Sequence, residues 1–197
     1  LSLAVALWSA NAGMKAIIDA LNVAYGERER RGFIRLTLIS FAFTLGVIVA
    51  GLFAISAIVV FPVGTSYLGL ETLAAMLVQW LRWPLLLAAL LVGLAVLYRF
   101  GPNRTVAGWQ WVSVGSGAAA VLWLAGSAAL SFYLSRFADF GATYGSLAAG
   151  VGLMMWLWLS AIVVLLGAEL NAEIEPQTAR DSTVGPEKPL GARGATM

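Results

Sequence analysis

The sequence predicts an all-α fold, a polytopic transmembrane helix bundle. Of its 197 residues, 60% are hydrophobic and only 11% are charged, whereas a soluble domain usually carries about 25% charged residues. Several uncharged runs are long enough to cross about 30 Å of hydrocarbon as helices. These runs are continuously apolar and do not alternate between apolar and polar residues, which argues against a β-barrel.

Four full spans are expected, at about residues 36–63, 80–98, 109–135 and 146–168. The second is the weakest, because its uncharged run is short and Arg82 lies near its edge. A buried or half-membrane helix is the alternative for that segment. The charge pattern favours a span, since removing it would disturb the alternation of positive residues between the two sides.

Positive residues alternate strongly along the connecting segments. Five lie within residues 15–35, one in the next connection, two in the third, one in the fourth and three after residue 175. Ten of the twelve Lys and Arg residues therefore fall on one side. By the positive-inside rule that side is the cytoplasm, so we expect the C-terminus to be cytoplasmic.

The two ends of the chain differ in character from the spans. Leu1 opens an apolar run about half as long as a span, so we expect a truncated N-terminal helix and a C-terminal fragment of a longer protein. Residues 14–24 have helical apolar spacing with polar residues opposite, which predicts an interfacial amphipathic helix. The membrane domain is expected to cover residues 1–175, and residues 176–197 to form a disordered cytoplasmic tail.

Four ordered strings resemble one known family. They are ALNVAYGERERRGF (20–33), YRFGPNRTVAGWQWVSVGS (98–116), TYGSLAAG (143–150) and WLWLSAIVVLLGAELNAEIE (156–175). Together they resemble the YihY / virulence factor BrkB family of bacterial inner-membrane proteins, over about residues 1–175. Family members usually have six membrane helices, so the resemblance implies that the first helix and most of the second are missing here. It also implies a multi-pass location in the bacterial inner (plasma) membrane and a role in the cell envelope.

The family once carried the label ribonuclease BN, and the residues here do not support that activity. The chain has no His and no Cys, so it lacks the commonest general base and every thiolate ligand. It also lacks a dense set of carboxylates and a basic, aromatic surface suited to RNA. We therefore expect a protein that is not an enzyme, with no cofactor, no metal and no nucleic-acid partner.

The last apolar run ends in an unusual polar motif that contains Glu169, Asn171 and Glu173. Carboxylates are disfavoured at a helix C-terminus, and Glu169 and Glu173 lie one turn apart, where like charges repel. Ion pairs with Arg99, Arg104 or the arginines of residues 28–35 are the leading explanation, and they would lock helix ends and form a cytoplasmic gate. Metal binding would need more ligands than one helix offers. A proton-relay glutamate is a further alternative.

Two loops and the basic segment supply the remaining candidate residues. Asn103 lies in a Gly-Pro-Asn turn between two arginines. Tyr144 lies at the outer start of the last span, where a substrate contact is conceivable. Asn22, Tyr25 and Arg31 lie in the basic segment, expected to anchor at headgroups or to dock anionic lipid or the terminal carboxylates.

Three functions remain open at this stage. The first is transport or flipping of an amphiphilic lipid or lipid-linked substrate, whose tail stays in the bilayer while its head meets Ser127, Ser131, Tyr133, Ser160 or the boundary charges. The second is a non-transporting scaffold or an envelope-integrity and serum-resistance factor, and the third is a membrane enzyme. The expected partners are membrane lipids, through anionic headgroups at the cytoplasmic face, and a homo-oligomer is left open.

Overall fold

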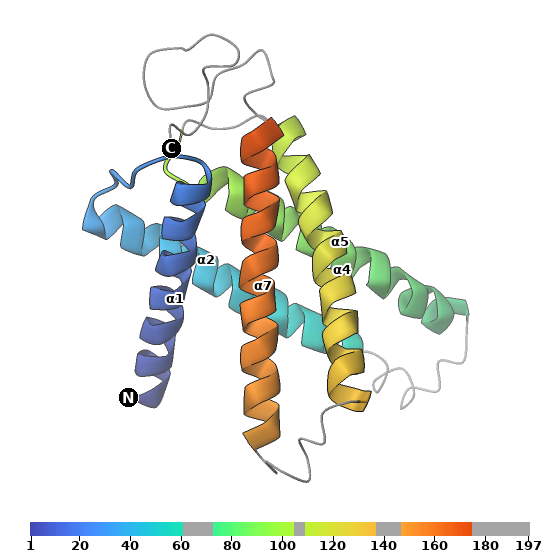
Figure 1. Ribbon diagram of the computed structural model, residues 1–197. Helices are drawn as coiled ribbons and strands as arrows, with labels where there is room; N and C mark the ends of the chain where they lie inside the picture. Colours follow the sequence, from blue (N-terminus) through green and yellow to red (C-terminus); the bar gives the residue numbers. More distant parts are fainter. Residues whose placement is uncertain (61–72, 105–108, 137–146, 175–197) are drawn as a thin grey trace.

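The computed structural model describes residues 1–60, 73–104, 109–136 and 147–174 (Figure 1). All regular structure in these residues is helical, which confirms the predicted fold class. The elements are α1 (Ser2–Ala24), α2 (Phe33–Ile55) with its π-helical continuation η1 (Ser56–Val60), α4 (Leu73–Phe100), α5 (Trp109–Arg136) and α7 (Leu147–Ile174).

Four of these helices are long and apolar enough to cross a membrane. The candidate spans are Phe33–Val60, Trp80–Phe100, Val114–Arg136 and Ala149–Ile174. The segment predicted least strongly, around residues 80–98, is thus one of the four. The last helix continues beyond the expected residue 168, and it carries the polar C-terminal motif as helix to Ile174.

The N-terminal part differs from the expectation of two separate helices. Residues 1–10 and 14–24 belong to one continuous helix, α1, which contacts both α2 and α7. Gly13 does not interrupt it, because one glycine costs a helix only about 1 kcal/mol relative to alanine, and tertiary contacts offset that amount. Residues 14–24 were expected to expose their polar side chains, but Asn22 is buried whereas Val23 is exposed.

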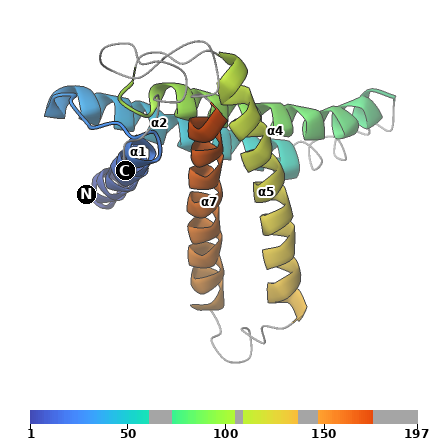
Figure 2. The ribbon, with the colours of Figure 1, turned by 45° about the horizontal axis from the view of Figure 1, so that its top comes forward.

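The helices form two groups that cross each other. The helices α5 and α7 pack together, α1 contacts α7, and α2 and α4 run obliquely across this group (Figures 1 and 2). At one end of the bundle α1, α4 and α7 end while α2 and α5 begin. We call this the polar end. It gathers the segments that the charge pattern assigned to one side of the membrane.

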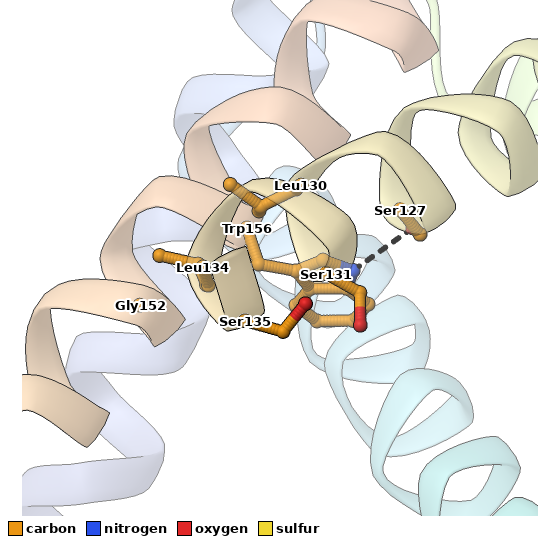
Figure 3. A pocket seen from close by; sticks show the side chains of 7 residues that line it. All are labelled: Ser127, Leu130, Ser131, Leu134, Ser135, Gly152 and Trp156. Atoms are coloured by element: carbon orange, nitrogen blue, oxygen red, sulfur yellow. Dashed lines mark hydrogen bonds between the residues drawn. The ribbon is translucent and has the colours of Figure 1, made fainter. Parts of the chain in front are cut away.

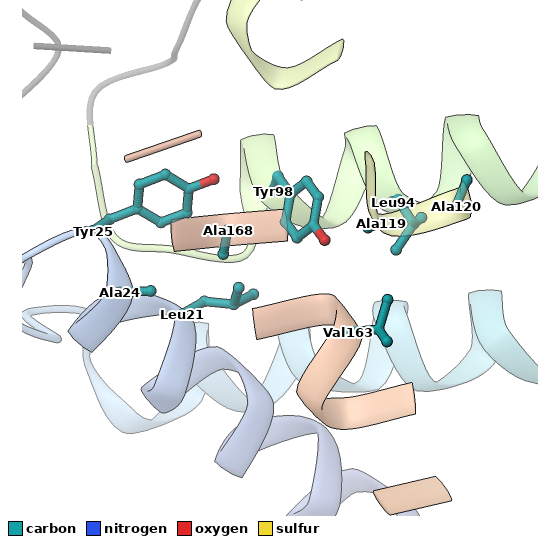
Figure 4. Close-up of a cluster of buried hydrophobic side chains, with 9 residues drawn as sticks. All are labelled: Leu21, Ala24, Tyr25, Leu94, Tyr98, Ala119, Ala120, Val163 and Ala168. Atoms are coloured by element: carbon teal, nitrogen blue, oxygen red, sulfur yellow. The ribbon is translucent and has the colours of Figure 1, made fainter. Parts of the chain in front are cut away.

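The hydrophobic core lies toward the polar end, where α1, α4, α5 and α7 meet (Figure 4). Its buried side chains are Leu21, Ala24, Tyr25, Leu94, Tyr98, Ala119, Ala120, Val163 and Ala168. Elsewhere large apolar side chains point outward, among them Val49, Met154 and Trp158. Such an exposed apolar surface suits helices whose surroundings are lipid.

Glycines of α5 and α7 let these two helices cross closely. A Cβ atom on Gly115 would overlap the carbonyl oxygen of Gly167 and the Asn171 side chain, and one on Gly167 would overlap the hydroxyl of Tyr98. Small residues let helix backbones approach in this way. The small-residue spacing around Gly46 in α2 makes no such approach, because nothing lies within 4 Å of a Cβ placed there.

A tight cap ends α1 and turns the chain back at the polar end. Gly26 has φ 64°, a left-handed conformation that glycine adopts without steric cost. The Gly26 N–H donates to Val23 O at 3.0 Å and the Glu27 N–H donates to Asn22 O at 2.8 Å. This pair of bonds is the Schellman motif, and it satisfies the last carbonyls of the helix.

Candidate functional site

Asn171 is the inward-facing residue of the polar motif on α7. Its side chain is 1% exposed, its Oδ1 accepts a hydrogen bond from the Gly115 N–H at 2.8 Å, and its Nδ2 donates to the Tyr25 hydroxyl at 3.3 Å. One side chain thereby joins α7 to the start of α5 and to the end of α1. The close approach of Gly115 makes these bonds possible, because no Cβ separates the two helices there.

The two glutamates of this motif face the other way. Glu169 and Glu173 are exposed, since residues two positions away on a helix point about 200° from the inward-facing one. No described residue forms an ion pair with either of them. Within the described residues neither glutamate therefore forms the expected ion pair with Arg99, Arg104 or the arginines of residues 28–35.

An ion pair joins Glu29 and Arg31 in the loop between α1 and α2. The Arg31 guanidinium donates from Nε to Oε1 at 2.8 Å and from Nη2 to Oε2 at 2.6 Å, and the Arg31 backbone N–H donates to Oε1 at 2.8 Å. Arg31 Nη2 also donates to the carbonyl oxygen of Gly101 at 2.8 Å. The two side chains are 6% (Arg31) and 19% (Glu29) exposed, so this bidentate pair is largely shielded from water.

Two asparagines extend this pair to the loop after α4. Asn22 donates from Nδ2 to Glu29 Oε2 at 3.0 Å, and its Oδ1 accepts from the Asn103 N–H at 2.7 Å. Asn103 in turn donates from Nδ2 to the carbonyl oxygen of Arg28 at 2.9 Å. The Gly-Pro-Asn turn is therefore tied to both the end of α1 and the loop that follows it.

Arg104 and two tyrosines complete the connection to α7. The Arg104 guanidinium lies 3.9 Å from the centre of the Tyr25 ring, and its Nη2 donates to the carbonyl oxygen of Tyr98 at 3.2 Å. The Tyr98 hydroxyl donates to the carbonyl oxygen of Val164 on α7 at 2.8 Å. Cation–π contact adds to these bonds, because guanidinium groups favour aromatic faces.

We call these connected side chains the polar network: Asn22, Tyr25, Glu29, Arg31, Tyr98, Asn103, Arg104 and Asn171. Six of them were candidates from the sequence, whereas Glu29 and Tyr98 were not. Glu29 lies in a run of alternating charges, and Tyr98 lies at the end of an apolar span. In both places the sequence gives no sign of the residue that the side chain will contact. Of the other candidates, Arg99 lies next to the network at the end of α4, Glu169 and Glu173 lie outside it, and Tyr144 falls outside the described residues.

The network gives Glu29 a shifted titration. Hydrogen bonds from the Arg31 side chain, and further bonds from the Arg31 backbone and Asn22, lower the pKa of this carboxyl from the usual 4.5 to about 2. Partial burial acts in the opposite direction and is outweighed. The carboxylate therefore stays ionised, and the network intact, at every pH near neutrality.

Because its pKa is lower in the folded protein, Glu29 stabilises the fold fully above about pH 4.5, and this contribution declines as the pH falls toward 2. We predict that the unfolding temperature of the wild type falls more steeply between pH 5 and 2, where these two pKa values lie, than that of Glu29→Gln. Thermal unfolding in detergent at a series of pH values measures this. Equal slopes in both proteins would contradict the shifted pKa.

Asn171→Leu tests the inward side of α7. The change leaves the Gly115 N–H and the Tyr25 hydroxyl without this partner, so we predict a loss of about 2 kcal/mol in unfolding free energy. The exposed neighbours are matched controls, and Glu169→Gln or Glu173→Gln should change it by less than about 0.5 kcal/mol. If Glu169→Gln destabilises as strongly as Asn171→Leu, the carboxylate has a structural partner after all.

The far half of the α5–α7 pair carries a different arrangement. Trp123 on α5 donates from Nε1 to the hydroxyl of Ser160 on α7 at 2.9 Å, and Trp156 on α7 donates to Ser127 on α5 at 3.1 Å. The two indole rings meet edge to face with centroids 5.4 Å apart. Trp123 and Trp156 therefore pack between the two helices.

An open groove of about 540 Å³ has Trp156 in its lining (Figure 3). Three serines one turn apart on α5 form its polar wall, and its lining is Ser127, Leu130, Ser131, Leu134, Ser135, Gly152 and Trp156. Ser131 is exposed and donates no hydrogen bond within the described residues, whereas the Ser135 hydroxyl donates to the Phe132 carbonyl at 2.9 Å. The groove thus offers hydroxyl groups beside apolar side chains.

The described residues contain no set of side chains suited to bind a metal ion. Among residues 1–60, 73–104, 109–136 and 147–174, no three His, Cys, Asp or Glu side chains are placed to hold one ion. The donors and acceptors of the polar network form hydrogen bonds that join helix ends. It is an arrangement that fixes a conformation at the polar end.

Four apolar spans joined at one end by a buried polar network define the class of this molecule: it is a multi-pass membrane protein. The chain belongs to the virulence factor BrkB family, whose model matches residues 1–190.

Several bacterial proteins are similar to the chain. The ribonuclease-like protein YfkH of Bacillus subtilis is 35% identical over 175 residues, which cover 85% of this chain and 62% of YfkH. A UPF0761 membrane protein of Pseudoalteromonas translucida is 32% identical over 75% of this chain and 50% of its own length, and one of Tolumonas auensis is 38% identical over 42% and 27%. The chain thus spans less than two thirds of these relatives. No solved structure matches it.

Proposed function

We propose that this protein moves an amphiphilic lipid, or a lipid-linked substrate, across the membrane. The observation that carries the proposal is the groove between α5 and α7, where the Ser131 hydroxyl and the indole of Trp156 lie beside leucine side chains. A lipid headgroup can hydrogen-bond to such a wall while its acyl chains remain in the bilayer. The absence of acidic residues from the described parts of α5 and from residues 149–168 of α7 suits such a substrate better than a coupling cation.

The polar network has a supporting part in this proposal. It fixes the ends of α1, α4 and α7 against one another, so a substrate path that opens along α5 and α7 would remain closed at the polar end. We propose that the polar end faces the cytoplasm of a bacterial inner membrane. The exposed arginines Arg28, Arg30 and Arg35 at this end support that orientation.

The proposal assigns no enzymatic step to the chain. The relative YfkH is named as ribonuclease-like, but hydrolysis of RNA at neutral pH needs acid–base or metal groups. This chain has neither His nor Cys. The polar network, the richest polar cluster in the described residues, is committed to internal hydrogen bonds.

Transport is tested by filling the groove. The whole protein is reconstituted in liposomes, and the movement of a fluorescent phospholipid between leaflets is followed by chemical quenching of the outer leaflet. Gly152→Leu places a side chain in the groove, where a Cβ is in ordinary contact with Leu134, so it should slow the movement of the lipid. Ser131→Val should also slow it, because it removes the hydroxyl that would contact the headgroup. Gly150→Leu is the matched control, because nothing lies within 4 Å of a Cβ there.

The outcomes separate the two main alternatives. Movement that is lost with Gly152→Leu and retained with Gly150→Leu supports transport through the groove. If the wild type moves no labelled lipid or lipid-linked sugar, the transport proposal fails and a non-transporting scaffold becomes the better interpretation.

A further inference from the structure

The contact between α1 and α2 is unusually polar for helices in an apolar environment. On α2, Ser40 and Thr44 are buried and Thr37 is half-buried, all on one face. On α1, Lys15 donates to Thr37 of this face, and the buried Asn11 lies one turn before Lys15. We call these five residues the α1–α2 seam. The polar network does not include them.

Lys15 holds a positive charge within the seam without an acidic partner among the described residues. Its Nζ donates to the Thr37 hydroxyl at 2.9 Å and lies 4.8 Å from the centre of the Phe33 ring. The described ion pair is that of Arg31 and Glu29, and Asp19, one turn along α1, is exposed and forms none. An ammonium at the edge of an apolar span is costly unless an anion or water compensates it.

The start of α2 adds further positive potential at the same place. Phe33, which contacts Lys15, is the first residue of α2. Its N-cap, Gly32, offers no side-chain cap, and the first turn contains no acidic residue but does contain Arg35. Free N–H groups and the helix dipole favour an anion at such an end.

Asn11 gives a second, independent indication that the seam lacks a hydrogen-bond donor. The residue is 2% exposed, and its Oδ1 has no hydrogen-bond partner among the described residues. The buried hydroxyls of α2 are used elsewhere, because Ser40 donates to the Thr37 carbonyl at 3.0 Å and Thr44 donates to the Ser40 carbonyl at 2.8 Å. A buried acceptor left without a donor is uncommon, and a ligand with an O–H or N–H group would satisfy it.

We propose that the α1–α2 seam binds the phosphate of a membrane lipid, with Lys15 and Thr37 as its donors. A lipid is the source we favour, because both helices of the seam also expose large apolar side chains, Ile34 and Leu38 on α2 and Trp8 on α1 among them. These side chains would lie against acyl chains while the phosphate meets the ammonium. A headgroup or backbone hydroxyl of the lipid would supply the donor that Asn11 lacks.

This inference deepens the proposed function by naming phosphate chemistry, and it rests on that function only in taking the ligand to be a lipid. Binding at equilibrium is measured without transport, so the two proposals fail separately. A protein that binds the lipid but never moves it would overturn the proposed function and leave the seam site standing.

The test compares lipid affinities of variants of the whole protein in detergent. Added phosphatidylglycerol is titrated while the unfolding temperature is recorded, since a ligand that binds the native state raises it. Lys15→Met should lower the apparent affinity by about tenfold and Thr37→Val by about threefold, whereas Lys15→Arg should retain it. Arg30→Gln is the matched control, an exposed cation of the same side outside the seam, and it should stay within about twofold.

Two results would overturn the site, and a third would overturn the lipid as its ligand. Equal losses with Lys15→Met and Arg30→Gln would mean that diffuse surface charge, and not the seam, attracts the lipid. Full retention of affinity by Lys15→Met and Thr37→Val would remove both proposed donors. Stabilisation by glycerol 3-phosphate or inorganic phosphate equal to that by phosphatidylglycerol would confirm the phosphate chemistry and refute the lipid as its source.

Discussion

Gly115→Ala is expected to destabilise the protein by about 3 kcal/mol, the upper part of the usual range for an added methyl group in a packed interior. The new Cβ would overlap the carbonyl oxygen of Gly167 and the side chain of Asn171. Relief requires α5 and α7 to separate, and separation also breaks the hydrogen bond from the Gly115 N–H to Asn171 Oδ1. Unfolding in mixed detergent micelles, followed by tryptophan fluorescence, measures the loss.

Gly117→Ala is the matched control for this change. It lies two residues further along the same helix, and nothing comes within 4 Å of a Cβ placed there. The better helix propensity of alanine should leave it neutral or more stable by up to about 1 kcal/mol. Similar destabilisation by both variants would mean that α5 needs glycine for a reason other than its contact with α7.

Arg31→Met is expected to cost about 2 to 4 kcal/mol, since it removes hydrogen bonds to a charged group that is mostly shielded from water. Glu29 would lose its bidentate partner, and the Gly101 carbonyl oxygen would lose the donor that ties the end of α4 to this loop. Arg31→Lys should recover only part of the loss, because an ammonium cannot reproduce the forked geometry. Chemical denaturation of each variant gives the comparison.

Arg30 is the matched control, because its replacement removes the same charge without removing the bidentate hydrogen bonds of Arg31. Arg30 is exposed, so Arg30→Met should change the unfolding free energy by less than about 0.5 kcal/mol. If Arg30→Met costs as much as Arg31→Met, the net positive charge of the loop matters and the bidentate pair does not. Arg31→Met should also abolish the excess acid sensitivity of the wild type over Glu29→Gln.

The sequence predicted the spans well because hydrocarbon thickness sets a length that composition alone can reveal. Even the short second run was placed correctly, since the charges on either side of it had to alternate. The continuity of α1 through residues 11–13 was not predicted, because no comparable physical constraint is visible in the sequence there. One glycine is a weak signal, and contacts of α1 with α2 and α7, which no local pattern displays, decide the outcome.

The sequence singled out the strings around Asn22, Asn103 and Asn171, and the structure joins all three in the polar network. Their partners were not predicted, because charge suggested that Glu169 should bind an arginine. Rotation about the α7 axis, fixed by the glycine contact with α5, brings Asn171 inside and leaves the glutamates outside. Nothing in a helical repeat of small and polar residues tells which of two opposite faces meets a neighbour.

The hydroxyls of α2 have a consequence for how the chain enters the bilayer. Ser40 and Thr44 donate to carbonyl groups of their own helix, so α2 can leave the translocon without waiting for another helix to satisfy these donors. Lys15 instead donates its hydrogen bond to a residue of another helix, Thr37 on α2. Assembly should therefore follow an order in which α2 inserts on its own and α1 reaches its final position only once α2 is there.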